Sequence, residues 1–216
     1  MQHLSTIQTV IIWAFPVLFA ITVHEVAHGW VAKQLGYKTA MMMGRLTLNP
    51  LKHIDPMGTI VLPIMLVVLQ TGFVFGWAKP VPVTVENLRH PKQDMVWVAL
   101  AGPLSNGIMA LIWLLIIALS RQIHPSYPWV AEPLLYMGHA GVLINVVLMV
   151  LNLVPLPPLD GGRIVAGLLP GPLSWRFSRI EPYGFLILVA LLATGLLGEV
   201  LGPLVHTLTE RLFSLL

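Results

Sequence analysis

The chain alternates long apolar stretches with short polar segments, and the apolar stretches have membrane-spanning lengths. A helix needs about 20 predominantly apolar residues to cross a hydrocarbon core of about 30 Å. Five stretches reach or approach this length, at residues 5–31, 57–75, 95–120, 134–152 and 183–201. Pro63, Gln70 and Gly72 interrupt the second stretch, which we therefore expect to be irregular. The pattern predicts an α-helical polytopic membrane protein.

Two short segments alternate polar and apolar residues with a period of two, which is typical of strands. They are residues 45–49 and 81–85. Pro80 and Pro82 favour an edge position for the second segment, because proline cannot donate to a strand ladder. We therefore expect a small membrane-associated β-sheet beside the helices.

The C-terminal part predicts one more helix followed by an amphipathic tail. In this tail Leu204, Leu208 and Leu212 share one helical face, which is typical of a helix in the membrane interface. We expect residues 1–216 to form a single integral-membrane domain. Its core would cover about 5–170, and the C-terminal helix and tail about 183–216.

The composition supports a membrane protein and narrows its chemistry. The chain is 56% hydrophobic and 10% charged, whereas a soluble domain typically carries about 25% charged residues. Its net charge of +3 comes from Lys and Arg residues that are spread along the chain, so nucleic acid is not an expected partner. It contains no cysteine, so a bound metal would need His and carboxylate ligands.

The distribution of basic residues predicts an orientation. The loop over residues 33–56 holds four Lys or Arg residues against one Asp, and Arg163, Arg176 and Arg179 follow Asp160. By the positive-inside rule, both segments are cytoplasmic. The apolar stretches before them would both run outside to inside, which requires an odd number of crossings between them. The interrupted segment 57–77 is therefore expected to re-enter without crossing.

The end of the first apolar stretch carries the sequence His24-Glu25-Val26-Ala27-His28. Glu25 is the only charged residue among the first 32, and a carboxylate inside hydrocarbon is expected mainly where it is paired or functional. Residues four apart lie on one face of a helix, so His24 and His28 can reach the same metal ion. The Glu between them is placed to accept a proton from a water molecule that the metal activates. The same five-residue pattern also occurs by chance in helices that bind no metal.

A third ligand is needed, because catalytic zinc usually has three protein ligands. The chain has three Asp residues, of which Asp55 and Asp94 fit ordinary turn and helix-cap roles. Asp160 follows an apolar stretch broken by prolines and precedes two glycines. Irregular backbone at membrane depth needs a protein interior or a wet cavity around it, so Asp160 is our candidate third ligand. The alternative is a simple Asp-Gly turn.

Asn152 lies just before the proline cluster and has two interpretations. It is either an amide that packs helices together or a hydrogen-bond donor to the substrate or the reacting oxygen. His53 and His139 have a suitable side chain for a ligand, but neither has a partner at ligand spacing.

These motifs resemble those of the site-2 proteases, zinc metalloproteases that cleave substrates within the membrane. His24-Glu25-x-x-His28 and Asn152-x-x-Pro155-x-Pro157-x-x-Asp160-Gly161 carry the resemblance. Ala101-Gly102-Pro103-x-x-Asn106 is similar to the family's intervening helix, while 44–50 and 76–82 are similar to its membrane-associated sheet.

The resemblance implies a core of three catalytic transmembrane helices and one zinc ion per chain, held by His24, His28 and Asp160. Glu25 would be the general base and Asn152 a polar helper. It further implies transmembrane protein or peptide substrates and a prokaryotic plasma membrane, with the active site toward the cytoplasm. The chain is expected to be a compact member without the PDZ or nucleotide-sensing modules of some relatives.

Two other functions remain open from sequence. A catalytically silent relative would bind membrane helices as an adaptor, although the intact His-Glu-His and Asp set argues against this. A metal transporter would usually show broken helices at matching positions of two halves, and the sequence shows no such symmetry.

Overall fold

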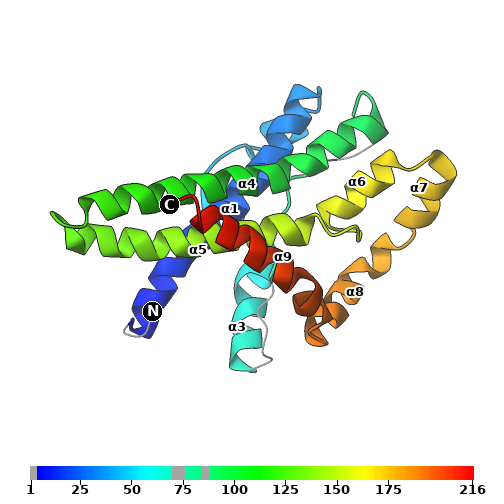
Figure 1. The fold of residues 1–216 in the computed structure, drawn as a ribbon. Coiled ribbons are helices and arrows are strands. Elements are labelled where there is room, and N and C mark those ends of the chain that lie inside the picture. The colour runs from blue at the N-terminus through cyan, green and yellow to red at the C-terminus, as the bar shows by residue number, and fades with distance from the viewer. Residues whose placement is uncertain (1–3, 70–75, 84–87) are drawn as a thin grey trace.

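Three long helices form the centre of the protein. The computed structural model describes residues 4–69, 76–83 and 88–216. The three helices are α1 (Thr6–Gln34), α4 (Pro91–Ile123) and α5 (Pro128–Asn152), and each is long and apolar enough to cross a membrane. In Figure 1, α4 and α5 lie side by side, and α1 runs across them with its C-terminal part passing behind α4. The prediction of a polytopic helical membrane protein is confirmed.

Local sequence explains where these helices begin. Ser5 caps α1 through its hydroxyl, which accepts a hydrogen bond from the Gln8 backbone N–H, while the Gln8 side chain accepts one from the Ser5 N–H. Both α4 and α5 begin with a proline, which suits the first helical turn because its N–H needs no partner there. Asp94 then accepts a hydrogen bond from the His90 N–H that precedes α4.

Small residues let α4 and α5 pack closely. A Cβ atom added to Gly141 would lie 2.3 Å from the Trp113 ring, and one added to Gly138 would lie 2.4 Å from Ile117. Such close approach is the usual basis of helix association in membranes. The resulting buried core comprises Met109, Ala110, Trp113, Leu114, Ile117, Val142, Val146 and Val150.

The second apolar stretch does not form a spanning helix in its described part. A π-helix, η2 (Pro56–Val61), leads into the short helix α3 (Leu62–Val68). Seven α-helical residues extend only about 10 Å. The following residues 70–75 lie outside the described part, so re-entry of the 57–77 segment stays a prediction. Before it, α2 (Thr39–Met42) and the 3₁₀ turn η1 (Pro50–Lys52) form a short connection.

The C-terminal third forms four further helices, which return toward the three-helix centre (Figure 1). They are α6 (Asp160–Leu168), α7 (Gly171–Ser178), α8 (Glu181–Ala193) and α9 (Leu196–Phe213). Gly195, with φ of +76°, separates α8 from α9, and the two axes are bent by 78°. Together the bent pair is apolar enough to count as a fourth, broken span.

Helix α9 differs from the predicted interfacial tail. Leu201, Val205, Leu208 and Leu212 pack against the buried core, whereas Leu204 is 49% exposed. The predicted stripe, Leu204, Leu208 and Leu212, advances in steps of four residues. Because an α-helix has 3.6 residues per turn, such a stripe gradually rotates away from the surface that the helix packs against. Alternating steps of four and three keep the contacting residues on one face of α9.

The prediction of a small β-sheet is wrong for the residues that the structure describes. Residues 45–49 and 81–83 are not strands, and 84–85 lie outside the described part. In the first segment, the Thr47 hydroxyl accepts from the Asn49 N–H, and the Asn49 side chain accepts from the Leu51 N–H. Local side-chain bonds of this kind replace strand pairing with turns.

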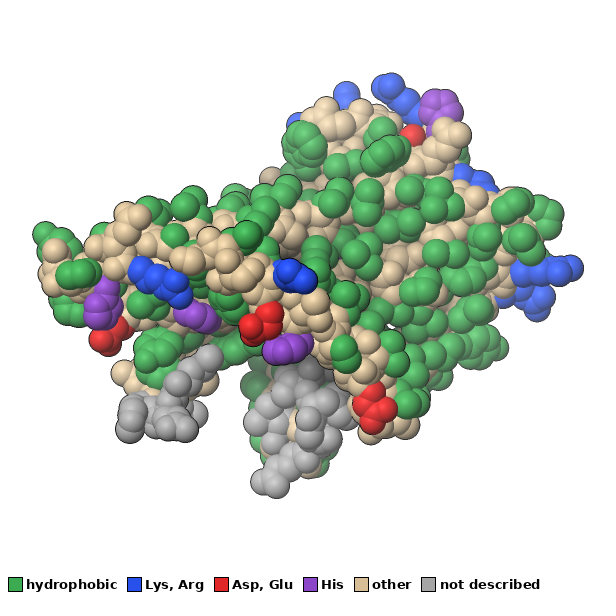
Figure 2. Space-filling model, in the orientation of Figure 1, with side chains coloured by type: hydrophobic (Ala, Val, Ile, Leu, Met, Phe, Trp, Pro, Cys, Tyr) green, Lys and Arg blue, Asp and Glu red, His purple; other side chains and the backbone are tan. Residues whose placement is uncertain are grey.

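Figure 2 shows that hydrophobic side chains cover much of the visible face, with charged side chains at its ends and a small group of them near its middle. Many large apolar side chains are exposed along the spanning helices, among them Phe15, Ile108 and Leu115. In water such a surface would be unfavourable, but lipid is its natural solvent. The protein is therefore an integral membrane protein.

Candidate metal centre

Three buried side chains converge where α1, α4 and α6 meet. His24 and His28 lie one turn apart on α1, and Asp160 is the first residue of α6. The His24 Nε2 atom is 3.0 Å from His28 Nε2. The Asp160 Oδ2 atom lies 3.2 Å from His24 Nε2 and 3.3 Å from His28 Nε2. The structure thus brings together the three residues that the sequence predicts as ligands.

One face of α4 fixes the orientation of both imidazoles. The His28 Nδ1–H donates to the Val98 carbonyl oxygen at 2.7 Å, and His24 Nδ1 lies 2.7 Å from the Asn106 side-chain oxygen. Oxygen acceptors at both Nδ1 atoms place the proton there and leave each Nε2 with a free lone pair. This is the arrangement by which proteins prepare histidine to bind a metal.

A second amide holds Asn106 in the required orientation. The Asn106 side-chain N–H donates to the Asn145 side-chain oxygen at 2.9 Å, and Asn145 donates in turn to the Gly141 carbonyl. Asn106 and Asn145 are both fully buried. Sequence reasoning noted Asn106 in a family motif but gave it no role. Its signal was the same as that of Glu25, a polar side chain inside an apolar span.

Gly102 provides the space for the imidazoles. It lies one turn from Val98 and one turn from Asn106, on the face of α4 that meets α1. A Cβ atom at this position would lie 2.4 Å from His24 Cε1 and 2.5 Å from His28 Nε2. These separations are well below contact distance, so only glycine fits here.

The glycines after Asp160 place that carboxylate. A Cβ atom on Gly161 would lie 2.3 Å from the Leu153 carbonyl oxygen, and one on Gly162 would lie 2.3 Å from the Pro157 nitrogen. The first turn of α6 is therefore packed against the broken segment that follows α5. The Gly161-Gly162 pair therefore allows the start of α6, which carries Asp160, to pack closely against this segment.

The donor atoms fit a zinc ion. Asp160 Oδ2 is buried and has no hydrogen-bond partner among the described residues. Two lone-pair nitrogens and a carboxylate oxygen at 3.0–3.3 Å repel one another unless a cation lies between them. Ligands about 2.1 Å from a tetrahedral zinc ion stand about 3.4 Å apart. Within the described parts of the chain, no other group of His, Asp and Glu brings three ligand atoms within 4.8 Å of one another.

Glu25 is half-buried beside the three ligands, and its Oε2 atom accepts a hydrogen bond from the Val81 N–H at 2.7 Å. Val81 belongs to the 76–83 segment, which crosses α1 at this point.

Asn152 is also half-buried, and its side-chain N–H donates to the Leu148 carbonyl one turn earlier. Its role in the reaction stays a prediction.

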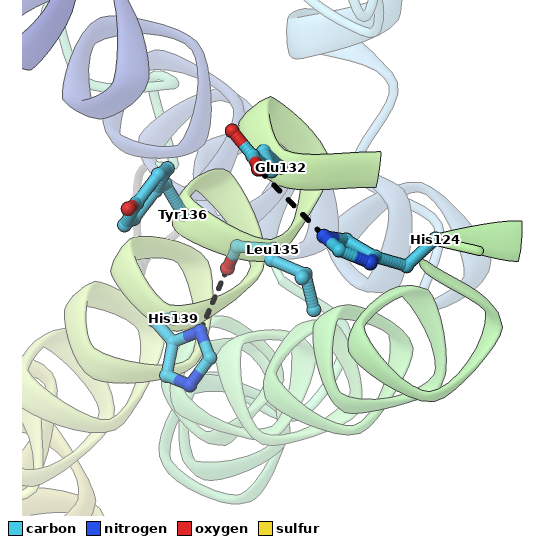
Figure 3. A pocket seen from close by; sticks show the side chains of 5 residues that line it. All are labelled: His124, Glu132, Leu135, Tyr136 and His139. Carbon is cyan, nitrogen blue, oxygen red and sulfur yellow. Dashed lines mark hydrogen bonds and ion pairs between the residues drawn. The ribbon is translucent and has the colours of Figure 1, made fainter. Parts of the chain in front are cut away.

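A second group of ionisable side chains lies where α4 turns into α5 (Figure 3). His124, Glu132, Leu135, Tyr136 and His139 line a pocket of about 500 Å³. His124 Nε2 is 3.7 Å from Glu132 Oε1, and the His139 Nδ1–H donates to the Leu135 carbonyl at 2.7 Å. The side chains of His124 and Glu132 are 45% and 60% exposed, so this distal pocket is open.

Known proteins confirm the family. The sequence model of Peptidase family M50 matches residues 128–194. YwhC of Bacillus subtilis, named as a zinc metalloprotease, is 37% identical over 92% of this chain and 87% of its own length. Rip2 of Mycolicibacterium smegmatis, also named as a zinc metalloprotease, is 30% identical over 88% of this chain and 69% of its own length.

An archaeal relative extends the comparison. The zinc metalloprotease MJ0392 of Methanocaldococcus jannaschii is 28% identical over 77% of this chain and 38% of its own length. The comparison with solved structures found no match for this chain. The buried His-His-Asp centre and these relatives agree on one assignment: the chain belongs to peptidase family M50, the site-2 protease family of intramembrane zinc metalloproteases.

Proposed function

We propose that His24, His28 and Asp160 hold one zinc ion per chain and that Glu25 is the general base for peptide-bond hydrolysis. The observation that supports this most directly is the convergence of three buried ligand atoms within 4.8 Å, with Glu25 on α1 between the two histidines. A carboxylate and two imidazoles with free Nε2 atoms are suitable ligands for zinc at a catalytic site, which keeps a position open for water.

Each side chain of the site has a distinct role in the proposed hydrolysis. When bound, zinc supplies Lewis acidity that makes hydroxide available near neutral pH. Asn106 and the Val98 carbonyl keep the imidazoles oriented, and Gly102 keeps the space between them open. Glu25 accepts the proton of the attacking water and later delivers a proton to the leaving amine. Asn152 is a candidate donor to the substrate carbonyl, in line with its place at the end of α5.

The substrates we propose are transmembrane segments of membrane-anchored proteins. Two of the three ligands lie on α1 and are oriented by α4, both helices of spanning length, and all three ligands are at most 9% exposed. A substrate helix must unwind here, because its carbonyls are otherwise engaged in its own hydrogen bonds. The site therefore favours segments with weak helix propensity near the scissile bond.

We further propose that the site faces the cytoplasm of a prokaryotic plasma membrane. Lys33 and Lys38 follow the α1 ligands, while Arg176 and Arg179 lie on and just after α7. Figure 2 shows Lys and Arg side chains at the end of the molecule where α1 terminates and α7 lies. Basic residues beside the spans mark the cytoplasmic side. With α4 as the single crossing between them, α1 and α5 would both run toward this side.

We also treat residues 1–216 as a single domain. Helix α9 supports this, since it returns from the C-terminal end to pack on the core that α4 and α5 form.

The test is cleavage of a model transmembrane substrate by the full chain reconstituted in vesicles. Glu25→Gln should retain zinc and lose proteolysis by roughly 10²–10⁴-fold, because the amide cannot accept the proton. Near-normal cleavage by Glu25→Gln would contradict the assignment of the base. A wild-type protein that carries zinc and binds the substrate without cutting it would instead favour the adaptor function.

A further inference from the structure

The Val81 backbone contacts the proposed general base directly. Its N–H donates to Glu25 Oε2 at 2.7 Å, and Val81 is only 7% exposed. A bond from a neutral donor to a carboxylate is stronger than one between neutral groups. The contact is therefore a substantial restraint on the Glu25 side chain.

The sequence around Val81 makes this amide distinctive. Pro80 and Pro82 have no N–H, so Val81 carries the single backbone donor between residues 80 and 82. Upstream, the Trp77 N–H donates to the Gly58 carbonyl and the Lys79 N–H to the His53 carbonyl. The amides of Trp77, Lys79 and Val81, at every second position, are thus all engaged, and the last of the three meets Glu25.

Close packing holds the segment against α1. Gly29 lies one turn after Glu25, and a Cβ atom there would lie 2.9 Å from Val81 Cγ1 and 2.6 Å from Leu46 Cδ2. At the other end, a Cβ atom on Gly58 would lie 2.3 Å from the Trp77 ring. The Val81 amide is therefore presented by a segment that is fixed on both sides.

We propose that the Val81 N–H is a positioning group for Glu25. By holding one carboxylate oxygen, it keeps the side chain in one orientation and leaves the other oxygen to exchange the proton. This inference rests on the proposed function, because it takes Glu25 to be the base. It also means that the Val81 amide is already engaged and is not free to pair with an unwound substrate.

The first test removes this single hydrogen bond donor without changing any side chain. The Val81 amide is replaced by an ester in the full chain, and the same replacement at Val83 is the matched control. We expect kcat to fall roughly tenfold to a hundredfold at position 81, with KM and zinc content unchanged. The Val83 ester should retain the wild-type kcat.

Three results of that test would overturn the proposal. They are a wild-type kcat for the Val81 ester, an equal fall for the Val83 ester, and loss of zinc from the Val81 ester. The last would show a structural role. A failure of the proposed function is separate, because it would appear as cleavage by Glu25→Gln, which keeps the Val81 donor.

The second test measures the bond without enzyme activity. Because Pro80 and Pro82 carry no N–H, deuterium retained in a fragment of residues 79–82 reports the Val81 amide. We expect slow exchange in the wild type and in Glu25→Gln, whose side-chain oxygen still accepts the bond, and faster exchange in Glu25→Ala. Equal protection in Glu25→Ala would show that Glu25 is not the partner of Val81.

Discussion

Two regions of the protein contain His and carboxylate side chains from helices, and only one is built as a metal centre. In the triad, His24, His28 and Asp160 are at most 9% exposed, and their ligand atoms lie within 4.8 Å of one another. In the distal pocket, His124 and Glu132 form a 3.7 Å pair and are about half exposed (Figure 3). Residue type is similar in the two regions, but burial is not.

The neighbours of the ligands explain the difference. In the triad, a face of α4 engages both Nδ1 atoms and keeps both Nε2 atoms free toward Asp160. In the distal pocket, His139 bonds to a carbonyl of its own helix, and His124 faces a solvated carboxylate. The triad thus differs from the distal pocket in having a neighbouring helix that orients its histidines.

The largest effect should come from removing a triad ligand. His24→Ala, His28→Ala and Asp160→Ala should each lose zinc and reduce proteolysis to background, because two protein ligands hold catalytic zinc poorly. His124→Ala and His139→Ala are the matched controls and should retain both. Metal analysis of the purified proteins, together with reconstituted cleavage, measures the effect. Full zinc in the Asp160 variant would remove that residue from the ligand set.

Adding one methyl group to a glycine of α4 should abolish zinc binding at Gly102 but not at Gly107. Gly102→Ala would place its Cβ 2.4 Å from His24 Cε1, so we expect loss of zinc from an otherwise folded protein. Gly107→Ala meets only the flexible Met149 sulfur at 3.3 Å and should retain zinc. Zinc titration of both variants makes the comparison. Normal zinc binding by Gly102→Ala would show that the imidazoles are not held as described.

Loss of the group that orients His24 should have a smaller effect. Asn106→Ala should weaken zinc binding about 10–100-fold, as is typical when a hydrogen-bond partner of a metal ligand is lost. Asn152→Ala should retain the zinc affinity, because Asn152 bonds within its own helix, and should lower kcat if it serves as the polar helper. Competition with a chelator gives the affinities. Equal affinities of Asn106→Ala and wild type would contradict the orienting role.

The smallest effect should come from the distal pair. Glu132→Gln removes the partner of His124 in a solvated setting, where an ion pair contributes less than about 1 kcal/mol. Thermal unfolding in detergent should be almost unchanged, and so should the zinc content. A loss of zinc would mean that the distal pocket influences the metal centre.

The three candidate ligands that the structure brings together could be proposed from sequence because their signal is local. The spacing of His24 and His28 and the rarity of carboxylates in apolar stretches pointed to the first two, and the broken segment before Asp160 pointed to the third. Gly102 and the Val81 amide could not be found in this way. Their importance depends on which face of α4 or of the 76–83 segment meets α1, and packing between distant segments decides that.

The errors have physical causes as well. The period-two pattern of residues 81–85 predicted a strand, but in the described part of that segment the Val81 amide, which a strand would offer to a neighbour, donates to Glu25. The single helix predicted over about 183–201 is instead broken at Gly195 into α8 and α9, and the contacting face of α9 follows the 3.6-residue period and not the four-residue stripe. In both cases the sequence contains the pattern, but contacts with distant segments determine which structure it forms and which face is buried.

The most direct test of the account is the X-ray absorption spectrum of zinc bound to the purified wild-type protein. We predict a first shell with two imidazole nitrogens and with oxygen ligands at about 2.0–2.2 Å. The imidazole signal should be unchanged in a variant that lacks both His124 and His139. A first shell that requires three imidazoles, or one that changes when the distal histidines are removed, would contradict the assignment of zinc to His24, His28 and Asp160.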